Sequence, residues 1–418
     1  MVSPAQAGFS SVSVPASKSL SHRALITAAL SEETSRLYGL ADNADIQATV
    51  RGLRDLGCSV HQDGDTWLVR GGMHADEVTI DCGESASTLR FLLPLAVCHA
   101  RTVHFTGHGR LMQRPLDAYR TIFENQGLLF QQEGSVLTVQ GPLQAGEYTV
   151  DAGISSQFAS GLLFALPLLE GNSTIRFARA ASRPYIRMTE YMLAQAGLQI
   201  ERTSYGFRIP GMQKASAFEY TCEKDMSAAA VFAVCAAIGK RTLEVRGMMN
   251  SVLQGDRVIT ELLQKMGARC EETASGMVWH PSELCGTEID LRDCPDLGPV
   301  LFAAAVKAQG RTVFRNAGRL REKESDRIEC MRRELQKLGV HMSVDADDTV
   351  TVYGEKTIRG GCEVSGHGDH RIVMALAVLG TAAEEPVTIS GCEAVRKSWP
   401  DFFDELQRAG YGVTGISQ

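Results

Sequence analysis

Six stretches of the chain are built almost entirely from apolar residues and recur at regular intervals. They comprise residues 24–30, 89–97, 158–168, 228–238, 300–306 and 372–379. A helix on a protein surface shows polar residues along one side, whereas these segments are apolar on nearly all sides. The pattern therefore predicts six helices in the interior of the protein.

A second pattern alternates with the first and ends each time at a glycine. Amphipathic segments precede Gly57, Gly127, Gly197, Gly267, Gly339 and Gly410, which are 70, 70, 70, 72 and 71 residues apart. Glycine suits the left-handed position that follows a helix. After the first glycine, residues 59–61 and 67–69 fit two strands around the turn at 63–65, and 78–80 and 102–105 fit two more.

This regular spacing indicates one supersecondary unit that is repeated six times. Each repeat combines helices with strands, so the sequence predicts an α/β protein. Three repeats make about 210 residues, an ordinary size for a domain. We therefore expect two domains of three repeats each, with a boundary near residues 220–224.

Cations stand at the start of the first interior helix. Val12 and Val14 alternate with serines as a short strand would, Pro15 ends that strand, and Lys18 and Arg23 follow at the helix start. The positive end of the helix dipole disfavours cations there, unless a bound anion shares the charge with the free backbone N–H groups. The alternative is a solvated helix start with two surface cations.

Polar residues occupy the equivalent position before the other interior helices. Ser85, Ser87 and Asp225 suit ordinary N-caps. Gln157 and Arg371 are poor caps, so capping does not explain them. If the two domains face each other, these helix starts would point into a shared cleft of positive potential.

Composition narrows the possible functions. The net charge of −7 argues against a nucleic-acid or membrane-surface binder, so any anion site is a local cluster. Eleven cysteines are scattered singly, which favours reduced thiols in the cytoplasm over zinc or disulfides. We see neither a signal peptide nor an apolar run of about 20 residues that would span a membrane.

The densest charge run is 319–327. We expect it to lead into a helix over 328–338, with Lys323 and Arg327 as a like-charge pair four residues apart that Glu324 and Asp326 offset. A mixed surface network is the alternative function-free interpretation. His99, His104 and His108 lack the spacing of a zinc site, and no phosphate-binding loop of the ATPase type is present.

Three motifs together resemble the 5-enolpyruvylshikimate-3-phosphate (EPSP) synthases, the 3-phosphoshikimate 1-carboxyvinyltransferases. They are Ser17-Lys18-Ser19 with Arg23, the charged run 321–327, and Asp369-His370-Arg371. The resemblance extends over nearly the whole chain. It implies an inside-out α/β prism of six βαβαββ repeats, with one domain of residues 1–16 and 224–418, a second of 17–223, and an active site in the cleft between them.

The reaction implied by the resemblance transfers the enolpyruvyl group of phosphoenolpyruvate to the 5-hydroxyl of shikimate 3-phosphate. No metal or organic cofactor is required. Arginine suits both anionic substrates because its guanidinium binds carboxylate and phosphate bidentately. By position, the residues implied to bind shikimate 3-phosphate are Lys18, Ser19, Arg23, Ser155, Ser156, Gln157, Ser182, Asp296 and Lys323. Those implied to bind phosphoenolpyruvate are Lys18, Ala86, Arg114, Gln157, Arg327, Arg371 and Lys397.

The resemblance also implies catalytic roles for Asp296, Glu324 and Lys18. Asp296 would act on the 5-hydroxyl and Glu324 would donate a proton to the methylene carbon, while Lys18 would lie between the two substrates. The family further implies a cytoplasmic enzyme whose partners are small anions, without nucleic acid or membrane, and we expect a monomer.

Two departures from the family pattern stand out. The loop often written Asn-x-Gly-Thr is Glu84-Ser85-Ala86-Ser87 here, and Arg319 replaces an asparagine found in some members. Glycine lets a ligand approach the backbone closely. The methyl group of Ala86 is therefore expected to crowd glyphosate, which is longer than phosphoenolpyruvate, and the hypothesis is glyphosate tolerance.

Other members of the fold class remain as alternatives. An enolpyruvyl transferase with another acceptor, such as UDP-N-acetylglucosamine, would carry Ala-Lys-Asn in place of residues 17–19 and a loop cysteine before Arg114-Pro115. RNA 3′-phosphate cyclases share the repeat, but their histidine context is not evident. A non-catalytic anion-binding protein could dispense with Asp296 or Glu324, and both are present.

Overall fold

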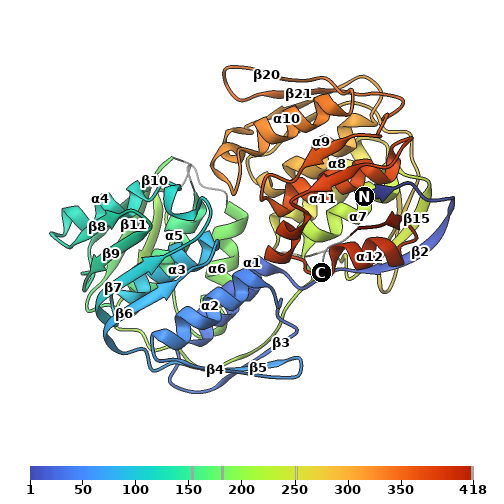
Figure 1. Cartoon of the computed structure of the whole chain (residues 1–418). Helices are drawn as coiled ribbons and strands as arrows, with labels where there is room; N and C mark the ends of the chain where they lie inside the picture. Colours follow the sequence, from blue (N-terminus) through green and yellow to red (C-terminus); the bar gives the residue numbers. More distant parts are fainter. Residues whose placement is uncertain (152–154, 180–182, 250, 252, 416–418) are drawn as a thin grey trace. The chain divides into compact units, whose positions relative to one another are not determined.

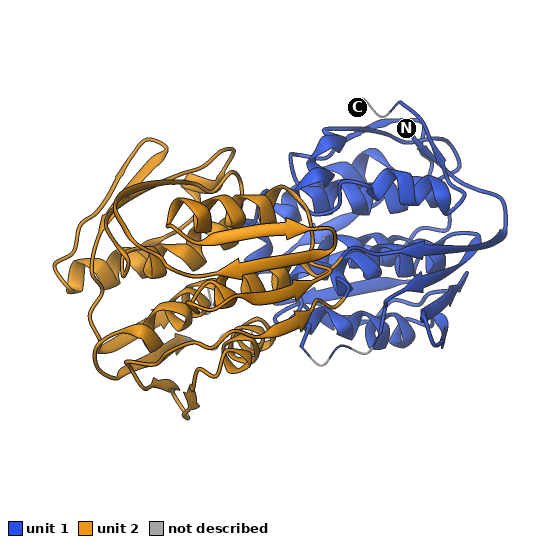
Figure 2. Cartoon of the chain, turned by 90° about the horizontal axis from the view of Figure 1, so that it is seen from below, with its two compact units in different colours: residues 1–15, 224–418 blue, residues 16–223 orange. Residues whose placement is uncertain are grey.

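A computed structural model describes residues 1–151, 155–179, 183–249, 251 and 253–415 of the chain. The chain divides into two compact units, which Figure 2 colours separately. Unit 1 consists of Met1–Pro15 and Lys224–Gln418, and unit 2 consists of Ala16–Glu223. One backbone hydrogen bond inside each unit joins the two segments at which the chain leaves and returns. Asp225 N donates to Pro15 O at 2.8 Å in unit 1, and Ser17 N donates to Glu223 O at 2.8 Å in unit 2.

The six apolar segments form buried helices, as predicted. In unit 2 these inner helices are α1 (Lys18–Ala28), α3 (Ala86–Ala96) and α5 (Ser156–Ala165), and in unit 1 they are α7 (Met226–Ile238), α9 (Gly298–Val306) and α11 (His370–Ala382). Every residue of α7 and α9 is buried. In unit 1 the three inner helices pack against one another, and in unit 2 α3 packs mainly against α5 (Figure 1).

The amphipathic segments form a second set of helices that end before the periodic glycines. They are α2 (Ala44–Asp55), α4 (Asp117–Asn125), α6 (Arg183–Gln195), α8 (Ile259–Lys265), α10 (Arg327–Lys337) and α12 (Phe402–Arg408). All six glycines have positive φ, from 68° at Gly127 to 100° at Gly57. This backbone conformation strains other residues, so the predicted role of these glycines as helix terminators is confirmed.

Short 3₁₀ helices occur before or after several of these helices. They are η1 (Leu111–Gln113), η2 (Leu166–Leu168), η3 (Gly255–Val258), η4 (Pro295–Leu297), η5 (Gly318–Glu322) and η6 (Cys392–Lys397).

The sheets of unit 2 share one topology among the residues described. Their strand orders are β14-β3-β5-β4, β6-β7-β9-β8 and β10-β11-β13-β12, and in each sheet the first pair is parallel and the others are antiparallel. In the second and third of these sheets the parallel strands flank an inner helix in the chain, and in all three the hairpin follows a helix of the second set, which accounts for the repeat. The strands are β3 (Ser35–Tyr38), β4 (Ser59–Asp63), β5 (Thr66–Arg70), β6 (Ala75–Asp81), β7 (Ala100–Thr106), β8 (Phe130–Glu133), β9 (Val136–Gln140), β10 (Glu147–Asp151), β11 (Ser173–Arg179), β12 (Glu201–Arg202), β13 (Gly206–Ile209) and β14 (Glu219–Thr221).

Unit 1 has two sheets of the same topology, β16-β17-β15-β2 and β18-β19-β21-β20. Its third sheet is assembled from both ends of the chain. β22 pairs with β23 in parallel, β1 pairs with β24 antiparallel, and a bridge between Val2 and Val387 joins the two pairs. The strands are β1 (Val2–Ser3), β2 (Gly8–Ser13), β15 (Arg241–Arg246), β16 (Arg269–Glu272), β17 (Gly276–His280), β18 (Glu288–Asp290), β19 (Arg311–Arg315), β20 (Met342–Val344), β21 (Val350–Tyr353), β22 (Glu363–Ser365), β23 (Thr388–Ser390) and β24 (Gly412–Val413).

Two strands, one in each unit, pair with a strand from a distant part of the sequence and not with the strand that follows the next helix in the chain. β2 precedes α1 in the chain but pairs with β15, the strand after α7. β14 precedes α7 in the chain but pairs with β3, the strand after α1. Each unit is thus completed by a strand from a distant part of the sequence, while its inner helices are buried.

Candidate active site

In unit 1, the three helices α9, α10 and α11 begin at a dense group of charged side chains, which we call the unit 1 cluster. It consists of Asp296, Lys323, Glu324, Arg327, Asp369 and Arg371. Asp296 lies in η4 just before α9, Arg327 begins α10, and Asp369 caps α11. The Asp369 carboxylate accepts the Arg371 backbone N–H at 2.9 Å, so the cap also fixes the start of the helix that carries Arg371.

Asp296 is the centre of the unit 1 cluster. Its Oδ1 accepts hydrogen bonds from Lys323 Nζ at 3.1 Å and from Arg327 Nη1 at 3.0 Å, and its Oδ2 lies 3.3 Å from Arg371 Nη2. Burial alone would raise the pKa of Asp296, but the charges of Arg371, Lys323 and Arg327 outweigh burial and hold the pKa well below its ordinary value. Asp296 is therefore ionised at neutral pH.

Arg327 is the most buried cation of this cluster, with 1% of its side chain exposed. Its Nε donates to Asp369 Oδ2 at 2.8 Å and its Nη2 donates to Glu324 Oε2 at 2.7 Å. Ser325 Oγ donates to the same Asp369 oxygen at 3.1 Å. Burial lowers the pKa of Lys323 to about 8, although Asp296 opposes this effect, and the neighbouring Arg327 charge adds to it.

The predicted helical pairing of Lys323 with Arg327 is wrong. Lys323 follows η5 in an extended conformation, and α10 begins only at Arg327, so the two residues do not share a helix face. They meet instead at Asp296. Asp326, predicted to offset them, caps α10 through Glu329 N and binds Arg321.

The loop between β22 and α11 is held by a buried carboxylate of α10. Glu334 accepts from Ser365 N at 2.9 Å, from His367 Nε2 at 2.8 Å and from Lys337 Nζ at 2.7 Å. Burial would raise the pKa of Glu334, but these hydrogen bonds hold it below its ordinary value. Lys397 Nζ donates to Gly368 O of the same loop at 2.8 Å, so this loop holds both Lys397 and the start of α11.

A second buried acid lies near Asp296. Asp256 accepts the Ser227 hydroxyl, and burial together with the negative charge of Asp296 raises the pKa of Asp256 to about 7, against the effect of Arg371. Sequence reasoning assigned no role to Asp256 because the residue stands in a short segment without a charge pattern.

In unit 2, the residues that we call the unit 2 cluster lie in the first two turns of α1, α3 and α5 and in the segment between η1 and α4: Lys18, Arg23, Arg90, Arg114 and Gln157. Lys18 begins α1, after the cap Ser17. Its Nζ lies 2.7 Å from Asp45 Oδ2, in the first turn of α2, and both side chains are less than one-fifth exposed. Asp45 was not predicted, since nothing in the sequence shows that α2 begins beside α1.

Arg23 is buried and held by neutral acceptors. Its Nε donates to Thr189 Oγ1 at 2.9 Å, its Nη1 to Ser19 O at 2.8 Å and its Nη2 to Tyr185 O at 3.1 Å. Its guanidinium lies 4.8 Å from the centre of the Phe91 ring. Burial lowers the pKa of Arg23 to about 10, which still leaves it charged at neutral pH.

Arg90, which sequence reasoning missed, positions Gln157. Arg90 Nη1 donates to Gln157 Oε1 at 2.9 Å and to the cap Ser155 Oγ at 3.4 Å, and its Nη2 donates to Pro115 O at 3.0 Å. Gln157 Nε2 donates in turn to Ser87 Oγ at 3.0 Å. One buried arginine thus ties the starts of α3 and α5 to the loop after Arg114. The position of Arg90 inside the apolar segment 89–97 is the signal in the sequence that could have identified this residue.

The other predicted residues of unit 2 lie near these helix starts, with one exception. Ser156 begins α5 and is buried, and Ala86 begins α3 after the cap Ser85 and is also buried. Arg114 follows η1, and its Nε is buried without a hydrogen-bond partner among the residues described. Ser182 lies outside the described residues.

A buried chain of hydroxyls fixes the loop that contains Ala86. His22 Nδ1 lies 2.8 Å from Thr49 Oγ1, which lies 2.7 Å from Thr88 Oγ1, and Thr88 donates to the cap Ser85 Oγ at 2.8 Å. Burial and the charges of Lys18 and Arg23 lower the pKa of His22 well below its ordinary value, so the imidazole is neutral. The chain connects α1, α2 and α3 without any ion pair.

Comparison with known proteins places the fold among the enolpyruvyl transferases. The structure of the enolpyruvyl transferase NikO from Streptomyces tendae matches with a TM-score of 0.77 over 98% of this chain and 97% of that one, at 16% identity, a likeness of fold alone. An EPSP synthase structure from Acinetobacter baumannii matches with a TM-score of 0.79 and 26% identity over 99% of both chains. The predicted fold class is confirmed.

The chain belongs to the EPSP synthase (3-phosphoshikimate 1-carboxyvinyltransferase) family, whose sequence profile matches residues 4–406. The 3-phosphoshikimate 1-carboxyvinyltransferase of Clostridium acetobutylicum is 41% identical over 412 residues, which cover 96% of this chain and 95% of the relative. That of Clostridium kluyveri is 38% identical over 405 residues, with 96% and 94% covered. The predicted family and transferase class are confirmed over the alternative with another acceptor.

Three further properties bear on the chemistry. All eleven cysteines are free thiols. Within the described ranges, no group of three His, Cys, Asp or Glu side chains is arranged to hold a metal ion. No helix in the part of the chain that the structure describes is long and apolar enough to cross a membrane.

Proposed function

We propose that this protein transfers the enolpyruvyl group of phosphoenolpyruvate to the 5-hydroxyl of shikimate 3-phosphate and releases inorganic phosphate. The observation that carries the proposal is the unit 1 cluster, in which a carboxylate already ionised at neutral pH stands among Lys323, Arg327 and Arg371. Both substrates are anions, and charge-assisted hydrogen bonds from arginine and lysine are the strongest means of holding them.

The two compact units act as the two enolpyruvyl transferase domains, and both supply residues to the same substrates. Phosphoenolpyruvate binds Arg327, Arg371 and Lys397 of unit 1 with Lys18, Ala86, Arg114 and Gln157 of unit 2. Shikimate 3-phosphate binds Lys18, Ser19, Arg23, Ser155, Ser156, Gln157 and Ser182 of unit 2 with Asp296 and Lys323 of unit 1. The Nε of Arg114, which is buried and has no hydrogen-bond partner among the described residues, supports an anion there.

Addition forms a bond between the 5-hydroxyl oxygen and carbon 2 of phosphoenolpyruvate while carbon 3 gains a proton. Asp296 receives the hydroxyl proton and Glu324 supplies the proton to carbon 3. A proton then passes from carbon 3 back to the Glu324 carboxylate while the bond between carbon 2 and the phosphate oxygen breaks, the phosphate leaves with the proton held by Asp296, and the double bond is restored. These are general acid–base steps that two carboxyl groups can carry out without a metal or organic cofactor.

Asp296 is assigned the role of a base although its pKa is low in the free protein, and substrate binding removes this conflict. Three cations hold the pKa of Asp296 low, which makes it a poor base in the free protein. Anionic substrates compete with Asp296 for Lys323 and Arg371 and with Glu324 for Arg327. As the substrates take up these cations, Asp296 becomes a stronger base, and the anion beside Glu324 favours the protonated carboxyl that a donor needs.

We also propose that the enzyme works as a monomer in the cytoplasm. Its eleven free thiols fit a reducing compartment. Its partners are the two small anions.

Calorimetry with shikimate 3-phosphate tests the proposed function. We expect saturable binding at one site per chain, and no binding of UDP-N-acetylglucosamine at the same concentration. Absence of shikimate 3-phosphate binding by a folded protein would overturn the proposal. Tight binding of UDP-N-acetylglucosamine instead would indicate that this molecule is the acceptor.

A further inference from the structure

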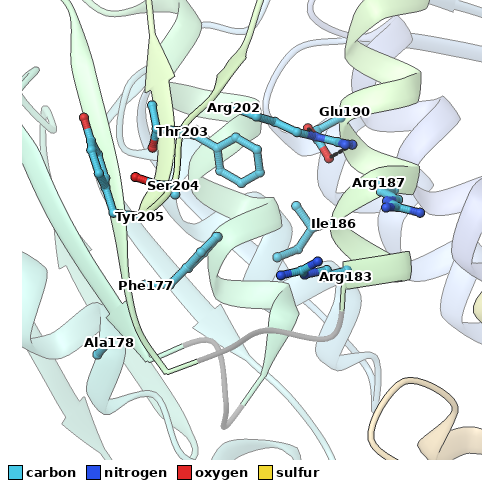
Figure 3. Close-up of a pocket in the computed structure, with 12 residues that line it drawn as sticks. Phe177, Ala178, Arg183, Ile186, Arg187, Glu190, Arg202, Thr203, Ser204 and Tyr205 are labelled. Carbon is cyan, nitrogen blue, oxygen red and sulfur yellow. Dashed lines mark hydrogen bonds and ion pairs between the residues drawn. The ribbon is translucent and has the colours of Figure 1, made fainter.

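A cavity of 520 Å³ lies in unit 2 between α6 and the strands β11, β12 and β13. This volume is in the range that holds small molecules. Figure 3 shows the side chains of Phe177 and Ile186 directed into it, with Tyr205 on the opposite wall. Its lining includes none of the residues assigned above to the substrates.

The floor of the cavity is apolar. Phe177 and Phe207 make an edge-to-face contact with ring centres 5.6 Å apart, and Ile186 from α6 completes this surface. Phe177 and Phe207 come from neighbouring strands, β11 and β13. A flat apolar ring of a ligand would find two aromatic partners there.

The charged residues on the rim favour an anion. Arg202 binds Glu190 bidentately, with Nε to Oε1 at 2.6 Å and Nη2 to Oε2 at 2.9 Å, so this carboxylate is already neutralised. Arg183 and Arg187, one turn apart on α6, make no hydrogen bond or ion pair with any residue that the structure describes. In Figure 3 Arg183 lies beside Ile186, and both residues line the cavity.

A hydroxyl in the wall is likewise without a partner in the part of the chain that the structure describes. Thr203 Oγ1 is buried and makes no hydrogen bond to any described residue. A buried polar atom of this kind is unfavourable unless a ligand or water satisfies it. Among the residues described, the cavity therefore combines an apolar floor with a cation and a hydroxyl that have no hydrogen-bond partner.

We propose that this cavity is a second ligand site of the protein, separate from the substrate-binding residues, which takes a small cyclic molecule bearing one carboxylate. The ring lies on Phe177, Phe207 and Ile186, and the carboxylate binds Arg183. The helix α6 connects this cavity with Arg23, a residue assigned above to substrate binding. The helix α6 that carries Arg183 and Ile186 also carries Tyr185 and Thr189, whose oxygens hold Arg23.

The probe is 4-fluorobenzoate, observed by ¹⁹F NMR with the full chain. A probe of this size is expected to bind with a Kd of about 1 mM. The uncharged 4-fluorobenzamide and the ringless anion acetate each lack one half of the recognition and are expected to bind at least about tenfold more weakly.

Variants locate the probe. Arg183→Gln is expected to weaken 4-fluorobenzoate binding about tenfold or more, and Thr203→Val several-fold. The matched control is Arg208→Gln, which removes an exposed arginine of β13 next to Phe207 that does not line the cavity. The control is expected to bind the probe like the parent.

Saturating shikimate 3-phosphate separates this proposal from the proposed function. We expect 4-fluorobenzoate to remain bound, with at most a changed affinity transmitted through α6. Complete displacement would place the probe at the substrate site and overturn the second site. Equal weakening by Arg183→Gln and Arg208→Gln, or equal binding of 4-fluorobenzamide, would also overturn it. None of these outcomes depends on whether shikimate 3-phosphate is the acceptor.

Discussion

The unit 1 and unit 2 clusters hold their cations in different ways. In unit 1, Arg327 and Lys323 are bound by carboxylates, chiefly Asp296 and Asp369. In unit 2, Arg23 and Arg90 are bound by hydroxyl, amide and carbonyl oxygens. Lys18, which pairs with Asp45, is the exception.

This difference indicates a division of labour. Neutral acceptors fix the position of a buried cation without cancelling its charge, so the unit 2 cluster remains attractive to anions. Carboxylates cancel that charge but provide groups that can exchange protons, which neutral oxygens of Ser, Thr and Gln do not at neutral pH. The unit 2 cluster is accordingly suited to holding anions, and the unit 1 cluster adds carboxyl groups that can exchange protons.

The largest effect is expected from the carboxyl groups of unit 1. Asp296→Asn and Glu324→Gln should each lower kcat by at least about 100-fold, the usual scale for lost acid–base catalysis. Steady-state kinetics with both substrates measures the effect. Asp348→Asn is the matched control, because Asp348 pairs with Arg321 outside the cluster and Asn accepts its positive φ of 60°. Near-normal kcat in Asp296→Asn and Glu324→Gln would show that these two carboxyl groups do not transfer protons in the reaction.

The second largest effect is expected for inhibitor binding at Ala86 in unit 2, through the size of this side chain and not through charge. If the Ala86 methyl group crowds glyphosate, the parent should tolerate this inhibitor and Ala86→Gly should bind it about 5- to 150-fold more tightly, the range expected for relief of overpacking. Inhibition constants for both proteins, measured against phosphoenolpyruvate, give the ratio. Tight and equal inhibition would show that the loop already makes room, with Ala86 serving only as a good helix former.

A pH effect distinguishes the lysine of unit 1 from its arginines. The pKa of Lys323 is about 8, so the side chain loses its charge as the pH rises through this value, while arginine stays charged. Between pH 7 and 9 the affinity for shikimate 3-phosphate should fall about tenfold, the worth of one charged hydrogen bond. The substrate phosphate is already doubly charged in this range, since its second pKa is near 6.

Calorimetry at the two pH values measures the fall in affinity. The variant Lys323→Arg keeps its charge and should show a flatter dependence. The same decline in parent and variant would assign the titration to another group.

The smallest effect is expected from the support of the unit 1 cluster. Glu334→Gln keeps the shape of the side chain but leaves His367 and Lys337 without a charged partner, which loosens the loop before Arg371. We expect the KM for phosphoenolpyruvate to rise about two- to fivefold, with kcat nearly unchanged, as for a weakened positioning contact. Glu329→Gln on the same helix, which binds only Arg332 and Arg333 among the residues described, is the control. Equal KM values in both variants would leave Glu334 without a positioning role.

Much of the fold could be predicted because its signals are local and repeated. The apolar segments and the glycines at 57, 127, 197, 267, 339 and 410 locate both sets of helices. The patterns along the chain do not show the exchange of β2 and β14, since strand pairing depends on contacts between distant parts of the chain, and it was the family resemblance that implied domain bounds placing these strands with their partners. The pairing of β1 with β24 is non-local for the same reason.

The site was predictable where a residue belongs to a charged motif and not where it supports one. Arg327 and Arg371 stand in such motifs, whereas Asp45, Arg90 and Glu334 do not. Their roles arise from neighbours supplied by other elements, as when Arg90 reaches Gln157 from α3. The error over Lys323 has the same origin, because Lys323 lies before the helix that begins at Arg327 and the two residues meet at Asp296, which another element supplies.

The most direct test of the account is the product formed when the protein meets both acceptors. Phosphoenolpyruvate is incubated with an equimolar mixture of shikimate 3-phosphate and UDP-N-acetylglucosamine, and the products are identified by mass spectrometry. The account predicts that shikimate 3-phosphate alone gains the enolpyruvyl group, with one phosphate released per product, and that Glu324→Gln forms this product at least about 100-fold more slowly. Transfer to UDP-N-acetylglucosamine, or release of phosphate without any enolpyruvyl product, would contradict it.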